Sequence, residues 1–301
     1  MGSAGASTSP SSARSGVAYA AAAYVCWGTF PLYFRALEGV PAPEILAHRI
    51  SWSALFMLLL VTARRHWPQV RAQLSVGVAL RLALSATLIS TNWLIYIWAV
   101  HAEHVLDASL GYFVNPLVSV LLGVLFLREP LSRRQVLAIA LAAVGVLSLV
   151  VRAGRFPWVA LSLAGTFGLY GLIRKRLPVD ATVGLLTEVV VLAPVAIGFL
   201  AWLDATGRGH FGASPRLTAL LASSGIVTAV PLMWFAVGVR RLRLATVGLL
   251  QYLNPTLQFT IAVVAFGEPL TPAHRVAFGC IWVGLAVYTS EAIGIARRAR
   301  A

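Results

Sequence analysis

The sequence predicts an all-α polytopic membrane protein with ten transmembrane helices arranged as two inverted five-helix repeats. The first observation is the composition: 59% of the 301 residues are hydrophobic, 11% are charged and the mean hydropathy is +0.82. A soluble domain of this composition would expose too much apolar surface to water. The second is a series of ten apolar stretches, each close to the ~20 residues that a helix needs to cross a bilayer core. The third is an internal duplication.

The duplication is visible as short strings that recur at a nearly constant spacing. At an offset of 139 residues, three landmarks of the first half return in the second: Asn115-Pro116 as Asn254-Pro255, Glu129-Pro130-Leu131 as Glu268-Pro269-Leu270, and Gly145 as Gly284. At an offset of 137, Gly28-Thr29-Phe30 returns as Gly165-Thr166-Phe167. Because five spans are an odd number, the second half must enter the membrane in the opposite orientation, which is the plan of secondary transporters.

The elements follow in order along the chain. Residues 1–15 are rich in Ser, Gly and Ala, so we expect a disordered tail. The first repeat, 16–151, holds spans at 16–36, 43–62, 77–100, 105–127 and 134–151. The second repeat, 157–295, holds spans at 157–173, 181–203, 216–239, 244–266 and 275–295, and a basic tail at 296–301 follows. The first stretch is a retained span, because a signal peptide would have no duplicate at 157–173.

The basic residues predict the orientation. If the N terminus is cytoplasmic, 17 Lys and Arg residues fall on the cytoplasmic side and six on the other. This bias predicts that both termini are cytoplasmic, with the lipid bilayer as the protein's partner. It also accounts for the net charge of +14, since the basic residues are spread over short loops and form no patch for nucleic acid.

The sequence carries no catalytic or cofactor motif. A phosphate-binding loop, a zinc-protease motif, a nucleophile elbow and paired cysteines with zinc spacing are all missing from it. Cys26 and Cys280 lie inside predicted helices as small apolar residues. We therefore expect no cofactor and no enzyme activity. Active transport would use a proton gradient, another ion gradient or an exchanged solute.

The two Asn-Pro pairs are candidate cavity residues. Each Asn lies about ten residues into its span, which at 1.5 Å per residue is ~15 Å deep, near the midplane. Each proline lacks an N–H and should free the carbonyl four residues earlier. One interpretation is a packed kink, and the other is that the freed carbonyls and the Asn side chains line a substrate cavity. The residues concerned are Asn115, Pro116 and Tyr112 in one half and Asn254, Pro255 and Gln251 in the other.

Ionisable residues inside spans form a second group of candidates. A charge at the centre of a helix costs at least ~2.5–3.5 kcal/mol, so such residues usually face a cavity or a partner. Arg49, beside His48, and Glu188 qualify, and the 139 offset makes Arg49 and Glu188 equivalent. They should differ in depth by roughly 10 Å, which argues against a direct salt bridge and leaves a shared cavity open. An Arg with a Glu would suit an amphoteric, amino-acid-like solute. The alternatives are a structural bond from Arg49 to helix carbonyls, and a packed His48 instead of a proton carrier.

Aromatic residues and the Glu-Pro-Leu strings complete the candidates. Trp93 and Tyr96, with Trp27, lie deep in their spans and could wall a cavity, although packing explains any one of them equally well. The Glu-Pro-Leu strings are hairpins. Ser132 and Gln135 fit a capping box after the first, and Thr271-Pro272 fits an N-cap after the second. A pairing of Glu129 with Arg133 or Arg134 is expected to contribute little.

Several strings resemble one known family. They are His48-Arg49-Ile50-x-Trp52-Ser53, Asn92-Trp93 followed by Ile97-Trp98-Ala99-Val100, and the run from Leu110-Gly111-Tyr112-Phe113 through Asn115-Pro116-Leu117 to Leu121-Leu122-Gly123. They resemble the RarD family, in the EamA group of the drug/metabolite transporter superfamily. The resemblance implies ten helices in two inverted repeats, with the first four helices of each repeat around a central cavity and the fifth peripheral.

The resemblance also implies a location, the bacterial plasma membrane, and a function. We expect a secondary transporter that moves small organic solutes, drug or metabolite, by alternating access, with export favoured. A facilitator or importer is the first alternative, and a membrane-embedded enzyme or assembly factor is a more remote one. A small-molecule substrate is the expected partner, while a homodimer stays open.

Overall fold

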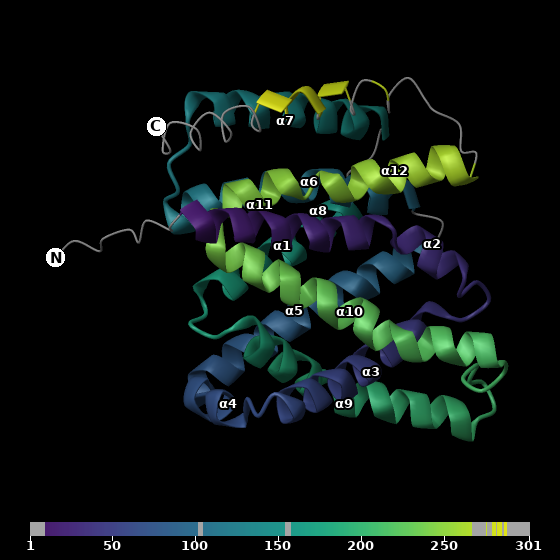
Figure 1. The fold of residues 1–301 in the computed structure, drawn as a ribbon. Coiled ribbons are helices and arrows are strands. Elements are labelled where there is room, and N and C mark those ends of the chain that lie inside the picture. Colours follow the sequence, from purple (N-terminus) through teal and green to yellow (C-terminus); the bar gives the residue numbers. More distant parts are fainter. Residues whose placement is uncertain are drawn as a thin grey trace.

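The computed structural model describes residues 10–101, 105–153, 158–266 and a few positions between 275 and 287. All regular elements in these ranges are helices (Figure 1). In chain order they are α1 (Pro10–Gly28), α2 (Phe30–Arg35), α3 (Ala42–Ala63), α4 (Trp67–Gln73), α5 (Val76–His101), α6 (Val105–Leu127), α7 (Arg133–Ala153), α8 (Trp158–Arg176), α9 (Ala181–Ala205), α10 (Pro215–Arg241), α11 (Leu244–Leu250) and α12 (Leu253–Phe266).

These helices correspond to the first nine predicted spans. The first span is divided into α1 and α2, the ninth into α11 and α12, and α3 and α5 to α10 each form one span. The tenth span lies mostly outside the described residues. By length and composition, five described helices suffice to cross a membrane: Ser11–Arg35, Ala42–Ala63, Val76–Tyr96, Ala181–Ala205 and Pro215–Arg241. The protein is therefore an all-α polytopic membrane protein.

Two local features depart from the sequence prediction. The short helix α4 was not expected. The expected disordered tail is also too long, because α1 already begins at Pro10. The end of α10 holds this segment, since Arg241 donates a hydrogen bond to the Ser15 hydroxyl at 2.7 Å. Contacts across the bundle thus extend the helix into a polar stretch that composition alone assigned to disorder.

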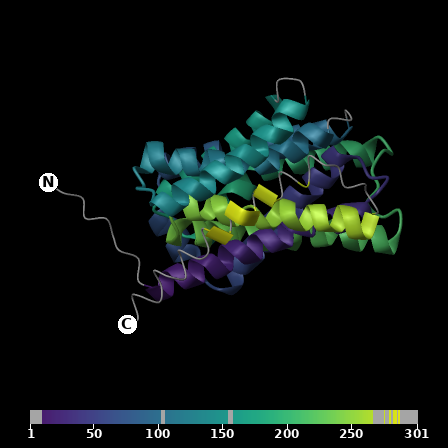
Figure 2. The ribbon, with the colours of Figure 1, turned by 90° about the horizontal axis from the view of Figure 1, so that it is seen from above.

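The two repeats interlock instead of standing apart. In the first repeat, α1 packs against α10, α11 and α12 of the second repeat, and α8 of the second packs against α5 and α6 of the first. Figure 2 shows α1 running beside α12. The fourth spans meet at equivalent positions, because the Tyr252 hydroxyl donates to the Phe113 carbonyl at 3.3 Å. This reciprocal packing is what an inverted duplication produces. Helix α7, the fifth span, lies at the edge of the bundle, as expected (Figure 1).

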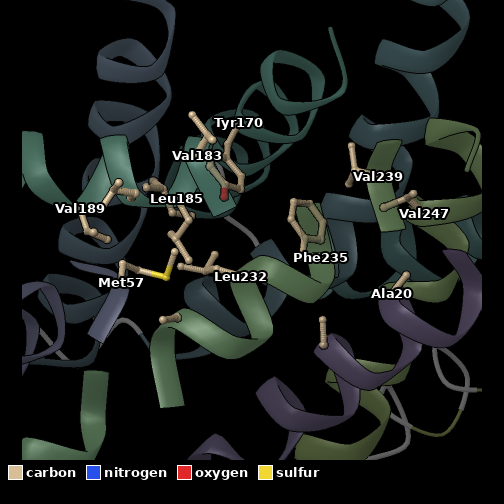
Figure 3. Packing of buried hydrophobic residues seen from close by; sticks show 14 of the residues in the cluster. Ala20, Met57, Tyr170, Val183, Leu185, Val189, Leu232, Phe235, Val239 and Val247 are labelled. Atoms are coloured by element: carbon tan, nitrogen blue, oxygen red, sulfur yellow. The ribbon is translucent and has the colours of Figure 1, made fainter. Parts of the chain in front are cut away.

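The main hydrophobic core is built from both repeats. It joins α1 and α3 of the first repeat to α8, α9, α10 and α11 of the second (Figure 3). At its centre Tyr170 stacks on Phe235, with ring centroids 5.8 Å apart, and Tyr24 meets Phe235 edge to face at 6.1 Å. Tyr24 and Tyr170 are almost completely buried. The core therefore holds the halves together instead of stabilising each one alone.

Helices α3 and α10 approach each other closely. A Cβ atom on Gly225 would lie 2.4 Å from the Trp52 carbonyl carbon, so only glycine fits there. The Ser53 hydroxyl donates to the Gly225 carbonyl at 3.0 Å. Small residues at such crossings allow transmembrane helices to pack backbone to backbone. This contact fixes α3, one turn away from Arg49, against the second repeat.

One end of the bundle gathers the α6–α7, α8–α9 and α10–α11 connections together with α4 (Figure 1). The predicted capping box is confirmed here. The Gln135 backbone N–H donates to the Ser132 hydroxyl at 3.1 Å, and the Ser132 N–H donates to the Gln135 side chain at 3.0 Å. Glu129 accepts a hydrogen bond from the Leu244 N–H at 2.9 Å and lies 3.4 Å from Lys175. Glu268 and Thr271 lie outside the described residues.

Candidate functional site

A cavity of about 390 Å³ lies between the two repeats. Its lining comes from α1, α2, α3, α5 and α6 of the first repeat and from α8, α10, Gln251 and α12 of the second. It extends to the α2–α3 turn at Glu38 and Gly39, both of which are exposed. Its polar and aromatic lining residues include Tyr24, Trp27, Phe30, Phe34, Arg49, Asn92, Trp93, Tyr96, Tyr112, Asn115, Phe167, Gln251, Asn254 and Gln258.

Arg49 is the basic residue in this lining. Its side chain is buried, and its Nε donates to the Thr228 hydroxyl on α10 at 2.9 Å. The guanidinium lies 4.4 Å from the centre of the Trp93 ring and 5.6 Å from that of Phe30. Among the described residues, no carboxylate lies within 4 Å of it. The structural bond uses only Nε, so the two terminal nitrogens are left to bind an anion in the fork geometry of a guanidinium.

Side-chain amides supply hydrogen-bond acceptors to the same cavity. The Asn115 Oδ1 and Gln251 Oε1 atoms are buried without a hydrogen-bond partner. Leaving a buried acceptor unpaired costs about 1–3 kcal/mol, so both would gain from an N–H or O–H donor on a solute or from water. The Asn254 oxygen is already engaged, accepting from the Gln258 amide at 2.9 Å. Asn92 donates to the Leu163 carbonyl at 2.8 Å and is part of the wall.

Aromatic rings form much of the remaining wall. Tyr96 and Tyr112 meet edge to face at 5.6 Å, and Trp27 and Phe167 do so at 5.9 Å. The sequence pointed to Trp93, Tyr96, Tyr112 and Trp27 but not to Phe30 and Phe167. Those two phenylalanines end the duplicated Gly-Thr-Phe strings, so the duplication itself was the signal that could have found them. For Thr228, which positions Arg49, the sequence offered no signal.

The two Asn-Pro pairs differ in their local structure. Both Asn115 and Asn254 line the cavity. Pro116 lies inside the continuous helix α6, whereas Pro255 lies in the first turn of α12, after a break at Gln251 and Tyr252. A first-turn residue needs no helical partner for its N–H, so proline fits there without loss.

The expectation of a freed Gln251 carbonyl was therefore wrong. That carbonyl accepts the backbone N–H of Asn254 at 3.1 Å. The helix is interrupted just before the Asn-Pro pair. The Gln251 carbonyl therefore accepts from the residue three positions later, in a tighter turn than an α-helix provides. Gln251 nevertheless lines the cavity, and its unpaired oxygen is on the side chain.

His48 and Glu188 do not line this cavity. The His48 ring stacks on Phe211, 5.1 Å between centroids, beside a second cavity. Glu188 lies 3.6 Å from Arg174 and accepts the Ser85 hydroxyl at 2.7 Å. The shared Arg49–Glu188 cavity that the sequence left open is not formed, because Arg174 already neutralises Glu188. Sequence spacing could not reveal this partner, which comes from the preceding helix.

A helical bundle of apolar spans that encloses a polar, aromatic-walled cavity between two interlocked halves is the architecture of a membrane transporter. Residues 14–151 match the EamA-like transporter family. Protein RarD of Escherichia coli is 45% identical over 287 residues, covering 95% of this chain and 97% of that protein. The chain belongs to the RarD family of EamA-like transporters, and it is a multi-pass membrane transporter of small solutes.

Other relatives agree with this assignment, and one solved structure shares the fold. The uncharacterized transporter YojE of Bacillus subtilis is 44% identical, covering 92% of this chain and 94% of that protein. The chloramphenicol-sensitive protein RarD of Pseudomonas aeruginosa is 34% identical, covering 90% of this chain and 92% of that protein. A solved crystal structure with 18% identity superposes with a TM-score of 0.69 over 91% of this chain and 96% of its own. At that identity it supports the fold alone.

Proposed function

We propose that this protein is a secondary transporter that moves a small organic solute by alternating access, with Arg49 binding an anionic group of the solute. The observation that carries the proposal is a buried guanidinium in a cavity built from both repeats, with no carboxylate within 4 Å among the described residues. An uncompensated buried cation is costly. A solute anion would supply the missing charge and so be bound selectively.

Access from one side fits the packing of the bundle. The cavity reaches the α2–α3 turn, while toward the other end the packing continues through Tyr170 and Phe235. Beyond them, Lys175 bonds to the Leu242 carbonyl and pairs with Glu129. The excess of basic residues at this packed end favours a cytoplasmic location. On this orientation the cavity faces outward, both termini are cytoplasmic, and rocking of the interlocked repeats would expose it inward.

The lining also favours a class of solute. Arg49 selects an anionic group, the unpaired oxygens of Asn115 and Gln251 select N–H or O–H donors, and the rings suit an apolar body. This combination matches an amphoteric, amino-acid-like solute. The sequence pointed to Glu188 as the group that would bind the amino group of such a solute, and the amide oxygens of Asn115 and Gln251 take that role instead. We take export as the direction, with import or facilitated diffusion as the alternatives.

Flux measurements on purified protein in liposomes test the proposal. Three matched probes separate the charges: L-phenylalanine, 3-phenylpropionate, which lacks the amine, and phenethylamine, which lacks the carboxylate. We expect phenylalanine to move fastest and phenethylamine slowest. Arg49→Lys should reduce phenylalanine flux nearly as much as Arg49→Ala, at least about tenfold each, because a compact ammonium cannot reproduce the guanidinium fork.

Arg81→Lys is the matched control. Arg81 lies on α5, is exposed and is not among the residues that line the cavity, so this exchange should leave flux unchanged. If phenethylamine moves fastest, or if both Arg49 variants transport normally, Arg49 is not an anion ligand. If liposomes with wild-type protein take up no more solute than empty liposomes, the transport proposal fails for these probes.

A further inference from the structure

A second cavity of about 530 Å³ borders a different face of α3. Ile45 and Arg49 face the first cavity, whereas Glu44 and His48 face the second. The opposite wall comes from α9 and the α9–α10 loop, including Asp204 and Phe211. One helix therefore carries residues of both cavities, so any movement of α3 changes the shape of both.

Glu44 is the central polar group of this second cavity. Its side chain is 1% exposed. The His210 backbone N–H donates to its Oε1 at 2.6 Å, and the His210 Nδ1 lies 2.8 Å from its Oε2. The Nε2 of His48 lies 3.9 Å from Oε1. Among the described residues, no Lys or Arg side chain lies within 4 Å of this carboxylate.

This environment differs from that of the other buried glutamate. Glu188 is neutralised by Arg174, whose charge is permanent at physiological pH. Glu44 has imidazoles instead, and an imidazole is the side chain whose charge normally changes between pH 5 and 8. A buried carboxylate needs a compensating positive charge or a proton of its own. The Glu44 group can therefore be neutral only while it holds one proton, on the carboxyl or on an imidazole.

The surroundings give this proton a path and a mechanical role. The His210 side chain is 37% exposed, so it can exchange protons with the solution at the α2–α3 end. His210 lies on the α9–α10 loop and Glu44 on α3, so the pair joins two elements. The other ionisable group in this cavity is Asp204, while Arg208 of the same loop lies against the Trp202 ring, 5.8 Å from its centroid. Gain or loss of the proton would change the attraction between α3 and the loop.

We propose that Glu44, His48 and His210 form a binding site for the proton that drives solute transport. This inference rests on the proposed transport function, because the site would couple a proton gradient to movement of α3 and of Arg49. The proton binds from the solution at the α2–α3 end while Glu44 on α3 is in contact with His210 on the α9–α10 loop. Its release on the other face accompanies the opposite orientation of the cavity. The only covalent bond that forms or breaks is the one to the proton, on a carboxylate oxygen or an imidazole nitrogen.

Infrared spectroscopy of purified protein tests proton binding without any solute. The difference spectrum between pH 5 and pH 8 should contain a carboxyl band that disappears in Glu44→Gln and an imidazole band that disappears in His210→Gln. Glutamine keeps an oxygen that can accept the His210 N–H, so the first variant should fold. His66→Gln removes an imidazole of α4's N-cap, away from both cavities, and should leave these bands in place. Identical spectra for wild type and Glu44→Gln would overturn the proposal.

Flux with an imposed pH gradient tests the coupling. Wild-type liposomes should accumulate L-phenylalanine under one direction of the gradient, and Glu44→Gln should lose this accumulation. Exchange of labelled for unlabelled phenylalanine needs no net proton movement, so the variant should retain at least about half of it. Wild-type accumulation that is the same with and without the gradient, or full accumulation by Glu44→Gln, would reject the proton site while the transport function stands.

Discussion

Helices α3 and α9 occupy equivalent places in the two repeats, yet they use their ionisable residues differently. At the equivalent positions stand Arg49 and Glu188, both buried. Arg49 faces a cavity and has a hydroxyl as its bonded partner, whereas Glu188 is enclosed by Arg174 and Ser85. The comparison shows that duplication preserves the position of a charge but not its role. A charge with a permanent partner is structural, and a charge left without one is available for a ligand.

The largest expected effect is the loss of stability on removing Arg174, the partner of Glu188. Arg174→Ala should lower the melting temperature and the yield of folded protein sharply, because breaking one side of a buried ion pair costs about 3–5 kcal/mol. The double variant Arg174→Met, Glu188→Gln should recover most of the loss, since no buried charge remains. Thermal unfolding in detergent is the measurement.

The same measurement on Arg49→Ala sharpens the contrast. This variant removes a cation with no carboxylate within 4 Å among the described residues, so its melting temperature should stay close to that of wild type. A strong loss of stability in Arg49→Ala, or none in Arg174→Ala, would show that the two roles have been assigned the wrong way round.

A smaller effect is expected from Thr228, which positions Arg49. Thr228→Val keeps the shape of the side chain but removes the hydroxyl that accepts from Nε. Flux of L-phenylalanine should fall several-fold, with a raised half-saturation concentration, while stability changes by about 0.5–1.5 kcal/mol. Rates over a range of solute concentrations check this.

Thr187→Val is the control for that change. Thr187 is also buried, but its hydroxyl donates to the Val183 carbonyl within its own helix. Its replacement should leave the half-saturation concentration unchanged. Equal effects of the two variants would mean that Thr228 contributes packing and does not orient the guanidinium.

The smallest expected effect is a difference in flux between variants of the two Asn-Pro pairs. Pro116→Ala adds an N–H inside α6 that can bond to the Tyr112 carbonyl, so it should straighten the helix and slow transport. Pro255→Ala acts in the first turn of α12, where the Gln251 carbonyl already accepts the Asn254 N–H, so the change should alter flux less than twofold. Parallel flux assays of both variants provide the measurement, and a larger loss in Pro255→Ala would contradict this assignment.

Much of the fold could be predicted from the sequence because its signals are local or periodic. The apolar stretches predicted where the helices lie, and the capping box at Ser132 predicted the start of the fifth span. The breaks inside the first and ninth spans escaped prediction. Each break involves only one or two polar residues, Thr29 in the first span and Gln251 in the ninth, within a span whose average hydropathy stays high, so hydropathy did not detect it. Of the candidate site, the sequence identified the residues that carry chemistry inside spans, including Arg49, Asn115, Gln251 and Asn254.

The sequence by itself determined a membrane bundle with an inverted repeat, because hydrophobicity and duplication are properties of the chain that any packing must satisfy. Only the tertiary structure decided which ionisable groups meet. Arg174 reaches Glu188 from the preceding helix, His210 reaches Glu44 from a loop 166 residues away, and Thr228 reaches Arg49 across the repeats. Whether a buried charge is neutralised depends on contacts within a few ångströms, and such contacts between distant segments leave no periodic trace in the sequence.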